Sequence, residues 1–440
     1  MLKGDIMKKI LVLVLCVLFL LSSCMNATEP AVTEKAETAP EKEETVTETV
    51  VITETEAETE AETQPASEKP EDVLARFDTD LLDFVSSGTA GNFVVSPISL
   101  KYALGLSLAG ADGKTKEQIL NAVCPDEAVF EDYIKKFNRF VEYFEHESEL
   151  MKDGYRDDPG KYPSAPDDSL KVADSVWRRQ DLPELKDGYR LASEMYGAEL
   201  KEFDRQTVIS DVNEWVRKNT GNMIKKTLPE SYDVEDLAVL IVNALYFKDA
   251  WASVFEVYGE DDFTTKDGDV VKKEYIKCKL RCGYYKDEKT QILDVPMRHS
   301  VSVAFVIGST DDLHNNLEKM SRSDITVYLP KIDVETSLTH GELCDFLKER
   351  GVTDAFVKGS ADFSRMSDTQ LYISDIIQKA KLSLDENGVE ASAATVIAHD
   401  TYSLPSTVRI NRAFSFFIHT TETNGETGAN AVLFEGMVIK

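Results

Sequence analysis

The sequence is poor in histidine, cysteine and basic residues, and each shortage excludes a class of function. Its 440 residues include six His and six Cys, and no combined His and Cys cluster has the spacing of a zinc site, so neither a metal nor a cofactor is expected. Lys and Arg number 49 against 79 Asp and Glu, which gives a formal net charge of −30. Nucleic acid and heparin bind basic surfaces, and neither is expected as a partner.

Sequence motifs of hydrolases and nucleotide-binding enzymes are also missing. The chain has no Gly-x-Ser-x-Gly elbow and no His-Glu-x-x-His motif. Gly113-Lys114-Thr115 ends like a phosphate-binding loop, but Leu108 stands where that motif needs its first Gly. We interpret the three residues as a turn after a helix, and the chain is not expected to be an enzyme.

The N-terminus has the layout of a targeting segment. Lys8 and Lys9 precede an apolar run from Ile10 to Leu21, which is too short for a typical membrane-spanning helix and fits a signal peptide. The run ends in Leu21-Ser22-Ser23-Cys24, which resembles a bacterial lipobox. That resemblance implies a signal peptide over residues 1–23, lipid on Cys24, and export to the bacterial cell envelope with the anchor on the outer face of a membrane or on the cell surface. The alternative is a plain secretory peptide with a chance Cys.

Residues 24–71 are expected to be a disordered tether behind the lipidated Cys. The segment is rich in Thr and Glu, as in Thr45-Val46-Thr47-Glu48-Thr49, and has no aromatic residue before the folded part. Such a composition cannot bury enough apolar area to offset the entropy of the chain.

Four further cysteines lie after the tether, namely Cys124, Cys278, Cys282 and Cys344. They are expected to be free, or to form at most one distant disulfide.

The periodicity of the remaining chain predicts an α+β fold. Val73, Leu74, Phe77, Leu81 and Phe84 share one helical face, and Ser96-Pro97 is a typical helix start for a helix that continues to Ala109. Helices are expected early, including 212–218, and strands late, including 237–244, 325–329 and 371–384. Residues 145–168 are polar and contain Gly and Pro, which indicates a long surface loop.

A stretch near the C-terminus has the composition of a strand where a loop would be expected. It begins with the turn signal Asn387-Gly388 and continues with small or β-branched residues to Ala398. Read with period two, Val389, Ala391, Ala393, Thr395 and Ile397 share an uncharged face. An ordinary half-buried strand is the simplest interpretation, but this segment lies between a long strand and a second strand system.

Several motifs follow one another in a recognisable order. They are Asn92-Phe93-Val94-Val95-Ser96-Pro97-Ile98-Ser99, Gly110 to Ile119, Asn243-Ala244-Leu245-Tyr246-Phe247-Lys248-Asp249-Ala250-Trp251, Asp354-Ala355-Phe356 with Ala361-Asp362-Phe363-Ser364, Gly388 to Thr395, and Val432 to Val438. Together they resemble the serpin family of serine protease inhibitors over residues 72–440. The resemblance implies one monomeric domain with three β-sheets, about eight or nine helices and an exposed, mobile reactive loop.

The same resemblance implies a suicide mechanism and names its residues. A serine protease cleaves the loop, and the freed loop inserts into the central sheet before the acyl-enzyme is hydrolysed. The hinge would comprise Glu386, Gly388, Val389, Glu390, Ala391, Ser392, Ala393 and Ala394. Counting fourteen positions forward from Gly388 and twelve back from Phe414 both reach Tyr402, so the reactive bond would join Tyr402 to Ser403. A Tyr before that bond suits chymotrypsin-like or subtilisin-like proteases.

Further positions resemble residues that support the opening of the central sheet. Lys331 would pair with Glu386, Trp215 would lie under the opening, and Ser96, Ser99, Asn213 and Gln378 would form a polar cluster where the sheet parts. The lipid anchor would be the sole contact with a membrane. The alternative function is a non-inhibitory serpin-fold binding protein whose loop is only a substrate.

Overall fold

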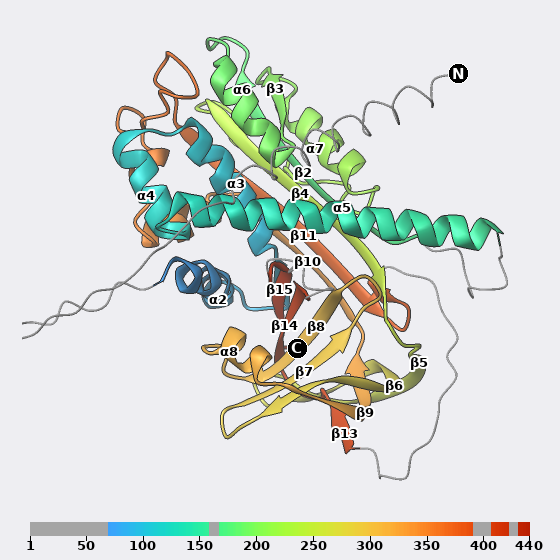
Figure 1. The fold of residues 1–440 in the computed structure, drawn as a ribbon. Coiled ribbons are helices and arrows are strands. Elements are labelled where there is room, and N and C mark those ends of the chain that lie inside the picture. Colours follow the sequence, from blue (N-terminus) through green and yellow to red (C-terminus); the bar gives the residue numbers. More distant parts are fainter. Residues whose placement is uncertain (1–68, 158–166, 390–405, 422–429) are drawn as a thin grey trace, which may run out of the picture. The chain divides into compact units, whose positions relative to one another are not determined.

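The computed structural model describes residues 69–157, 167–389, 406–421 and 430–440 (Figure 1). Helices dominate the first part of the chain and strands the second, which confirms the α+β class. The α-helices of the described part are α2 (Pro70–Gly88), α3 (Pro97–Gly110), α4 (Gly113–Val123), α5 (Glu127–Asp157), α6 (Asp187–Ser193), α7 (Val208–Asn219), α8 (Leu313–Glu318) and α9 (Glu342–Glu349).

The central sheet has six strands in the order β10-β11-β12-β4-β2-β3. Their bounds are β2 (Ser169–Arg179), β3 (Glu199–Phe203), β4 (Val239–Ala250), β10 (Ile332–Leu338), β11 (Ile373–Asp385) and β12 (Gly388–Val389). The long helix α5 crosses this sheet in Figure 1 and contacts β2. The strands predicted at 237–244 and 371–384 therefore belong to one sheet, as β4 and β11.

The second sheet has nine strands, in the order β1-β15-β14-β8-β7-β6-β9-β13 with β5 paired to β6. They are β1 (Phe93–Val95), β5 (Glu256–Thr264), β6 (Val270–Lys286), β7 (Thr290–Pro296), β8 (Val301–Gly308), β9 (Ser321–Pro330), β13 (Ser406–Arg409), β14 (Phe414–Thr420) and β15 (Val432–Val438). The long strand β6 pairs with β5 at its start and with β7 at its end. The described strands therefore form two hydrogen-bonded sheets where three were expected, because β6 pairs with β5, β7 and β9 within one sheet.

Helix α3 lies inside the core and begins where the sequence predicts. Ser96 caps it by accepting a hydrogen bond from the Ser99 backbone N–H, and Pro97 occupies the first turn. Thirteen of its 14 residues are buried, because it packs against both β4 and β15. The predicted helices at 73–84 and 212–218 are also present, as α2 and α7.

The loop predicted for residues 145–168 is wrong over its first half. Helix α5 continues to Asp157, and its polar residues form ion pairs along the helix, such as Lys152 with Glu149 at 3.0 Å and Arg156 with Asp153 at 2.8 Å. The polar residues of this segment form an exposed helical face with i,i+3 ion pairs. They do not form the predicted loop. Residues 158–166 lie outside the described part.

Two smaller expectations have different outcomes. Gly113-Lys114-Thr115 is not a turn after a helix, because these residues form the first turn of α4. The cysteine expectation is confirmed in its simpler form, since all four cysteines beyond the tether are free and buried.

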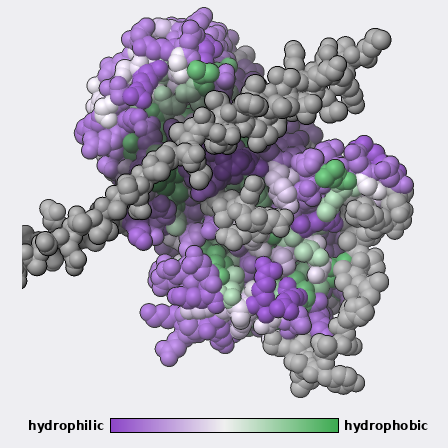
Figure 2. Space-filling view, viewed as in Figure 1, coloured by the Kyte–Doolittle hydropathy of each residue, from purple (hydrophilic) through white to green (hydrophobic). Residues whose placement is uncertain are grey.

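Hydrophilic residues predominate on the face shown in Figure 2, with only scattered apolar areas. No helix among the described residues is both long and apolar enough to span a bilayer. The predicted signal peptide, Cys24 and the tether up to residue 68 lie outside the described residues.

Candidate functional site

Two residues of the predicted hinge lie inside the central sheet. Gly388 and Val389 form the short strand β12, which pairs antiparallel with both β11 and β4. Val389 lies opposite Leu384 on β11 and Asp249 on β4, and its side chain is 2% exposed. The first hinge residues therefore already occupy a strand position between two neighbours.

Gly388 is required by the close approach of β4. Its φ of +120° is unfavourable for any residue with a Cβ. An added Cβ would lie 2.4 Å from the Asp249 carbonyl oxygen and 2.8 Å from the Ala250 Cα atom. The position of Gly in the predicted hinge thus has a direct steric cause.

Below β12, the same two strands β4 and β11 pair directly with each other. Their parallel pairing runs from Ile373 opposite Val239 to Gln378 opposite Asn243. Among the described residues, no pair joins β4 to β11 between the rung of Gln378 and Asn243 and the strand β12. We call this interval, 379–383 on β11 and 244–248 on β4, the parting line.

The predicted ion pair beside the hinge is present. The Lys331 Nζ atom lies 2.7 Å from Glu386 Oε2 and 3.6 Å from Glu274 Oε2. The hydrogen bond from Lys331 lowers the pKa of Glu386, and the same bond raises the pKa of Lys331. The pair connects the junction of β9 and β10 to the turn that leads into β12.

The predicted polar cluster is present only in part. Gln378 accepts a hydrogen bond from the Ser96 N–H and donates to the Ser96 carbonyl, at 2.8 Å each, and the Ser96 hydroxyl bonds that of Ser99 at 2.8 Å. Asn213 lies elsewhere: its amide oxygen accepts from the backbone N–H groups of Thr227 and Leu228. The prediction for Asn213 is wrong, and its side chain instead fixes the segment after α7.

Two other polar side chains lie in the central sheet beside Gln378, namely Asn243 and Asp174. Asn243 lies opposite Gln378 on β11 and opposite Asp174 on β2, and its amide donates to the Asp174 carboxyl at 2.7 Å. Sequence reasoning named the block that contains Asn243 without giving it a role. The signal was a polar residue in the middle of the largely apolar run from Val239 to Phe247.

The aromatic residue beside the hinge is Trp251, so the prediction for Trp215 is wrong. The Trp251 indole N–H donates to the carbonyl of Asp385 at 2.8 Å, next to the turn into β12. Trp215 belongs to α7, and its indole donates to Glu199 of β3 at 2.9 Å. Both tryptophans are buried, and residue type alone could not separate them.

A buried ionic network lies next to the pairing of Val389 with Asp249. Asp249 accepts hydrogen bonds from the ring and the backbone N–H of His299, at 2.8 and 3.1 Å, while Asp168 pairs with Arg298 at 2.7 Å. Burial raises the pKa of Asp249, and the contacts with His299 oppose that shift. Asp168, Asp249 and His299 bring three possible metal-ligand atoms within 4.8 Å. However, the bonds from His299 and Arg298 occupy three of the four carboxylate oxygens.

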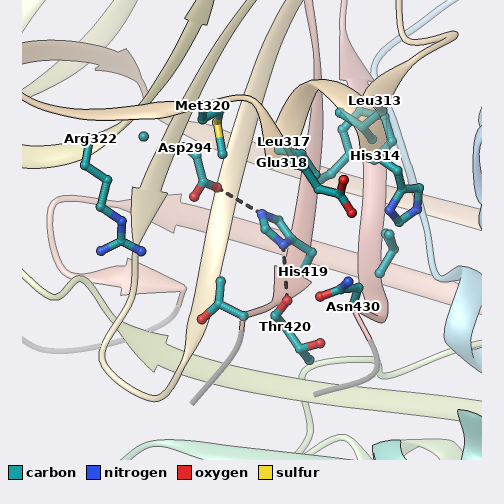
Figure 3. A pocket seen from close by; sticks show the side chains of 14 residues that line it. Asp294, Leu313, His314, Leu317, Glu318, Met320, Arg322, His419, Thr420 and Asn430 are labelled. Carbon is teal, nitrogen blue, oxygen red and sulfur yellow. Dashed lines mark hydrogen bonds and ion pairs between the residues drawn. The ribbon is translucent and has the colours of Figure 1, made fainter. Parts of the chain in front are cut away.

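A cavity of about 280 Å³ lies between α8, β7 and β14 (Figure 3). In its wall His419 bonds Asp294 at 2.9 Å and the Thr420 carbonyl at 3.3 Å. Burial disfavours the imidazolium form, but Asp294 more than compensates and the pKa of His419 is raised. Both ring nitrogens therefore face acceptors, which fits a protonated imidazole that holds β14 to β7. None of the sequence motifs pointed to this cavity.

The other predicted site residues lie outside the described residues. These are Glu390, Ala391, Ser392, Ala393 and Ala394 of the hinge and the reactive bond between Tyr402 and Ser403. The structure does describe both sides of this segment. Val389 lies in the central sheet, and β13, which begins at Ser406 in the nine-stranded sheet, pairs parallel with β9.

Comparisons with known proteins agree with this architecture. A family model described as "Serpin (serine protease inhibitor)" matches residues 72–440. The chain is 27% identical over 391 residues to Iripin-2 of Ixodes ricinus, covering 83% of this chain and 92% of that protein. It is 29% identical over 339 residues to the leukocyte elastase inhibitor of Equus caballus, covering 70% and 83%.

Solved structures show the same fold. The native state of the thermophilic serpin Tengpin matches with a TM-score of 0.66 at 26% identity, covering 84% of this chain and 93% of Tengpin. Serpin48 of the insect Tenebrio molitor also matches with a TM-score of 0.66, at 21% identity, covering 86% and 99%.

Proposed function

Since the chain belongs to the serpin family of serine protease inhibitors, we propose that it is a suicide inhibitor of serine endopeptidases with chymotrypsin-like or subtilisin-like specificity. The protease serine attacks the Tyr402 carbonyl and expels the amine of Ser403, which leaves an ester between the protease and Tyr402. Insertion of the freed loop between β4 and β11 then carries the protease away before water hydrolyses that ester. The chain acts as a trapped substrate and is not itself an enzyme.

The position of β12 carries this proposal. Continuing its antiparallel register along β11 brings residue 395 opposite Gln378, and continuing it along β4 brings the same residue opposite Asn243. Gln378 and Asn243 are themselves paired. Two independent registers thus converge, and residues 390–394 match the parting line without a bulge on either side.

The side chains along the parting line favour small inserted residues. In this register Ala391 would lie opposite Leu382 and Phe247, and Ala393 opposite Ala380 and Leu245. All four neighbours are buried. Because alternate residues share one face of a strand, Ala391 and Ala393 would follow Val389 into the core, where large or charged side chains would not fit.

The proposed location rests on the N-terminal sequence. Lys8, Lys9, the apolar run and Cys24 support export and lipidation. Two or more acyl chains on a protein suffice for stable anchoring. We therefore place a monomeric inhibitor domain on the outer face of a bacterial membrane or on the cell surface, attached through the tether that follows Cys24.

Incubation with a panel of proteases tests the proposal. Chymotrypsin and subtilisin are expected to form complexes that survive boiling in SDS, and trypsin is not. Active-site-blocked chymotrypsin serves as the control and should form none. Clean cleavage of the loop by every protease without any stable complex would exclude inhibition by trapping and would favour a non-inhibitory binding protein.

A further inference from the structure

Three buried polar side chains form a row across the central sheet. Asp174 on β2 lies opposite Asn243 on β4, and Asn243 lies opposite Gln378 on β11. Their exposed fractions are 1%, 4% and 4%. This row marks the last rung at which β4 and β11 pair before the parting line, so any separation of the two strands must reach it.

The hydrogen bonds of this row leave two oxygens without a donor. Gln378 uses both ends of its amide on Ser96. The Asn243 amide nitrogen donates to Asp174 Oδ1 at 2.7 Å, but within the described part of the chain Asp174 Oδ2 and Asn243 Oδ1 have no hydrogen-bond partner. Both are acceptors when Asp174 is ionised, so they cannot bond each other. Leaving both unpaired in the core is costly.

A single proton on Asp174 satisfies both oxygens. A neutral carboxyl group has one O–H donor as well as an acceptor. With Oδ2 protonated, Asp174 can donate to Asn243 Oδ1 while Oδ1 accepts from the Asn243 amide. The two side chains then form a reciprocal carboxyl–amide pair in which both of these oxygens have a hydrogen-bond partner.

The surroundings of Asp174 favour the neutral form. Burial raises the pKa of Asp174 to about 8, and the bond from Asn243 is the one opposing contribution. On the packed elements, Asn243 of β4 and Gln378 of β11 do not titrate. Tyr102 of α3 does titrate, but burial and then Asp174 hold its pKa well above the usual range.

We propose that Asp174 acts through Asn243 as a proton-dependent lock on the central sheet: in the closed sheet the neutral carboxyl and the Asn243 amide satisfy each other, whereas the ionised carboxyl leaves two oxygens unpaired, and separation of β4 from β11 relieves this by admitting water. The proposal rests on the loop-insertion step of the proposed function. It adds a residue and a pH dependence to that step.

The direction of the effect follows from proton linkage. In the closed sheet Asp174 keeps its proton, whereas in a hydrated, open sheet its pKa returns toward that of an ordinary carboxyl near 4. Opening therefore releases a proton, and it becomes up to tenfold more favourable for each pH unit between those two values. The rate of insertion should rise with pH and level off above the pKa of the closed form.

A peptide-annealing experiment isolates this step from the protease. An acetylated peptide with the sequence of residues 390–397, which begins where the strand position held by Val389 ends, is incubated with the intact full-length protein from pH 6 to pH 9. The annealing rate of the wild type is expected to rise at least tenfold over this range. In Asp174→Asn the amide can form the same reciprocal pair without a proton, so the rate should not change with pH.

The matched control is Glu435→Gln. Glu435 is another fully buried acid whose pKa burial raises, but it belongs to β15 of the other sheet. This variant should keep the pH dependence of the wild type. If Asp174→Asn keeps that dependence as well, the lock is excluded; Asp174→Ser replaces it if the Asn variant fails to fold.

Infrared spectroscopy measures the protonation state of Asp174 independently of loop insertion. At pH 7, the difference spectrum of the wild type and Asp174→Asn should contain the C=O band of a protonated carboxyl group. Absence of the band overturns the proposal. If the band is present but no peptide anneals at any pH, the insertion step has failed, and with it the lock, while the protonation of Asp174 stands.

Discussion

Gly388 lies so close to Asp249 that a Cβ atom on Gly388 would be 2.4 Å from the Asp249 carbonyl oxygen. This contact sets the point at which the chain passes from a turn into a sheet position between β11 and β4. Everything proposed about insertion starts from that point, since the residues after Val389 have a strand register available on both sides.

Gly388→Ala is expected to displace the hinge from the sheet. The φ of +120° and the contact with β4 together should cost about 1–3 kcal/mol. Chemical denaturation would show the loss of stability, and titration with protease would show more inhibitor consumed per protease trapped. Gly188→Ala is the matched control, because no atom of the described residues lies within 4 Å of its added Cβ; equal effects in both variants would contradict the steric account.

Val389→Arg should convert the inhibitor into a substrate. Val389 is 2% exposed, and burying its side chain contributes roughly 1.5–3 kcal/mol, whereas a buried unpaired charge is strongly unfavourable. The measurement is the fraction of inhibitor cleaved without complex formation, with Val389→Thr as a milder comparison. An unchanged fraction in Val389→Arg would mean that this side chain does not need to stay in the core.

The Lys331–Glu386 pair should contribute modestly and in a pH-dependent way. Both side chains are about one-quarter exposed, 26% and 27%, so a double-mutant cycle with Ala should give about 0.5–1 kcal/mol, reduced by salt. Because the pKa of Glu386 is lowered, the contribution is present above the ordinary Glu pKa and is lost as pH falls through the lowered value. A coupling energy that stays constant down to pH 2 would contradict the ionic interpretation.

The His419–Asp294 pair should make stability fall with rising pH. The pKa of His419 is raised in the folded state, so the contribution is complete below the ordinary His pKa of about 6.5 and is lost as pH rises through the raised value. The difference in unfolding free energy between the wild type and His419→Gln should therefore shrink from pH 6 to pH 9. His146→Gln, at an exposed position of α5, should show no comparable trend.

Tyr402→Arg tests the position of the reactive bond. Arg before the bond suits trypsin-like proteases, so the stable complex should shift from chymotrypsin to trypsin. Ser403→Ala provides a control, because it leaves the residue before the bond unchanged and should preserve the preference for chymotrypsin. Retention of the chymotrypsin preference by Tyr402→Arg would place the bond elsewhere.

Periodicity and local motifs predicted the elements of the fold better than the residues of the site. The apolar spacing of α2, the Ser96-Pro97 start of α3 and the strand pattern of β4 and β11 are local signals, and the structure contains all of them. The polar residues on the exposed face of α5 led to the wrong prediction of a loop, because ion-paired residues three positions apart make a sequence as polar as a loop.

The sheet-opening residues illustrate what sequence reasoning could not decide. Gln378, Lys331 and Glu386 were placed correctly, whereas Asn213 and Trp215 were chosen in place of Asn243 and Trp251. Each pair has the same residue type, but Asn213 and Trp215 lie on helix α7, whereas Asn243 lies on β4 and Trp251 directly follows that strand. Which element lies beside the opening is set by three-dimensional pairing.

The most direct test of insertion is the composition of the complex with chymotrypsin. Mass spectrometry of the SDS-stable complex should give one protease joined to the chain ending at Tyr402, plus a released peptide from Ser403 to Lys440. The melting temperature of the loop-cleaved protein should also rise far above that of the intact protein. Cleavage at Tyr402 with no covalent complex and an unchanged melting temperature would contradict insertion between β4 and β11.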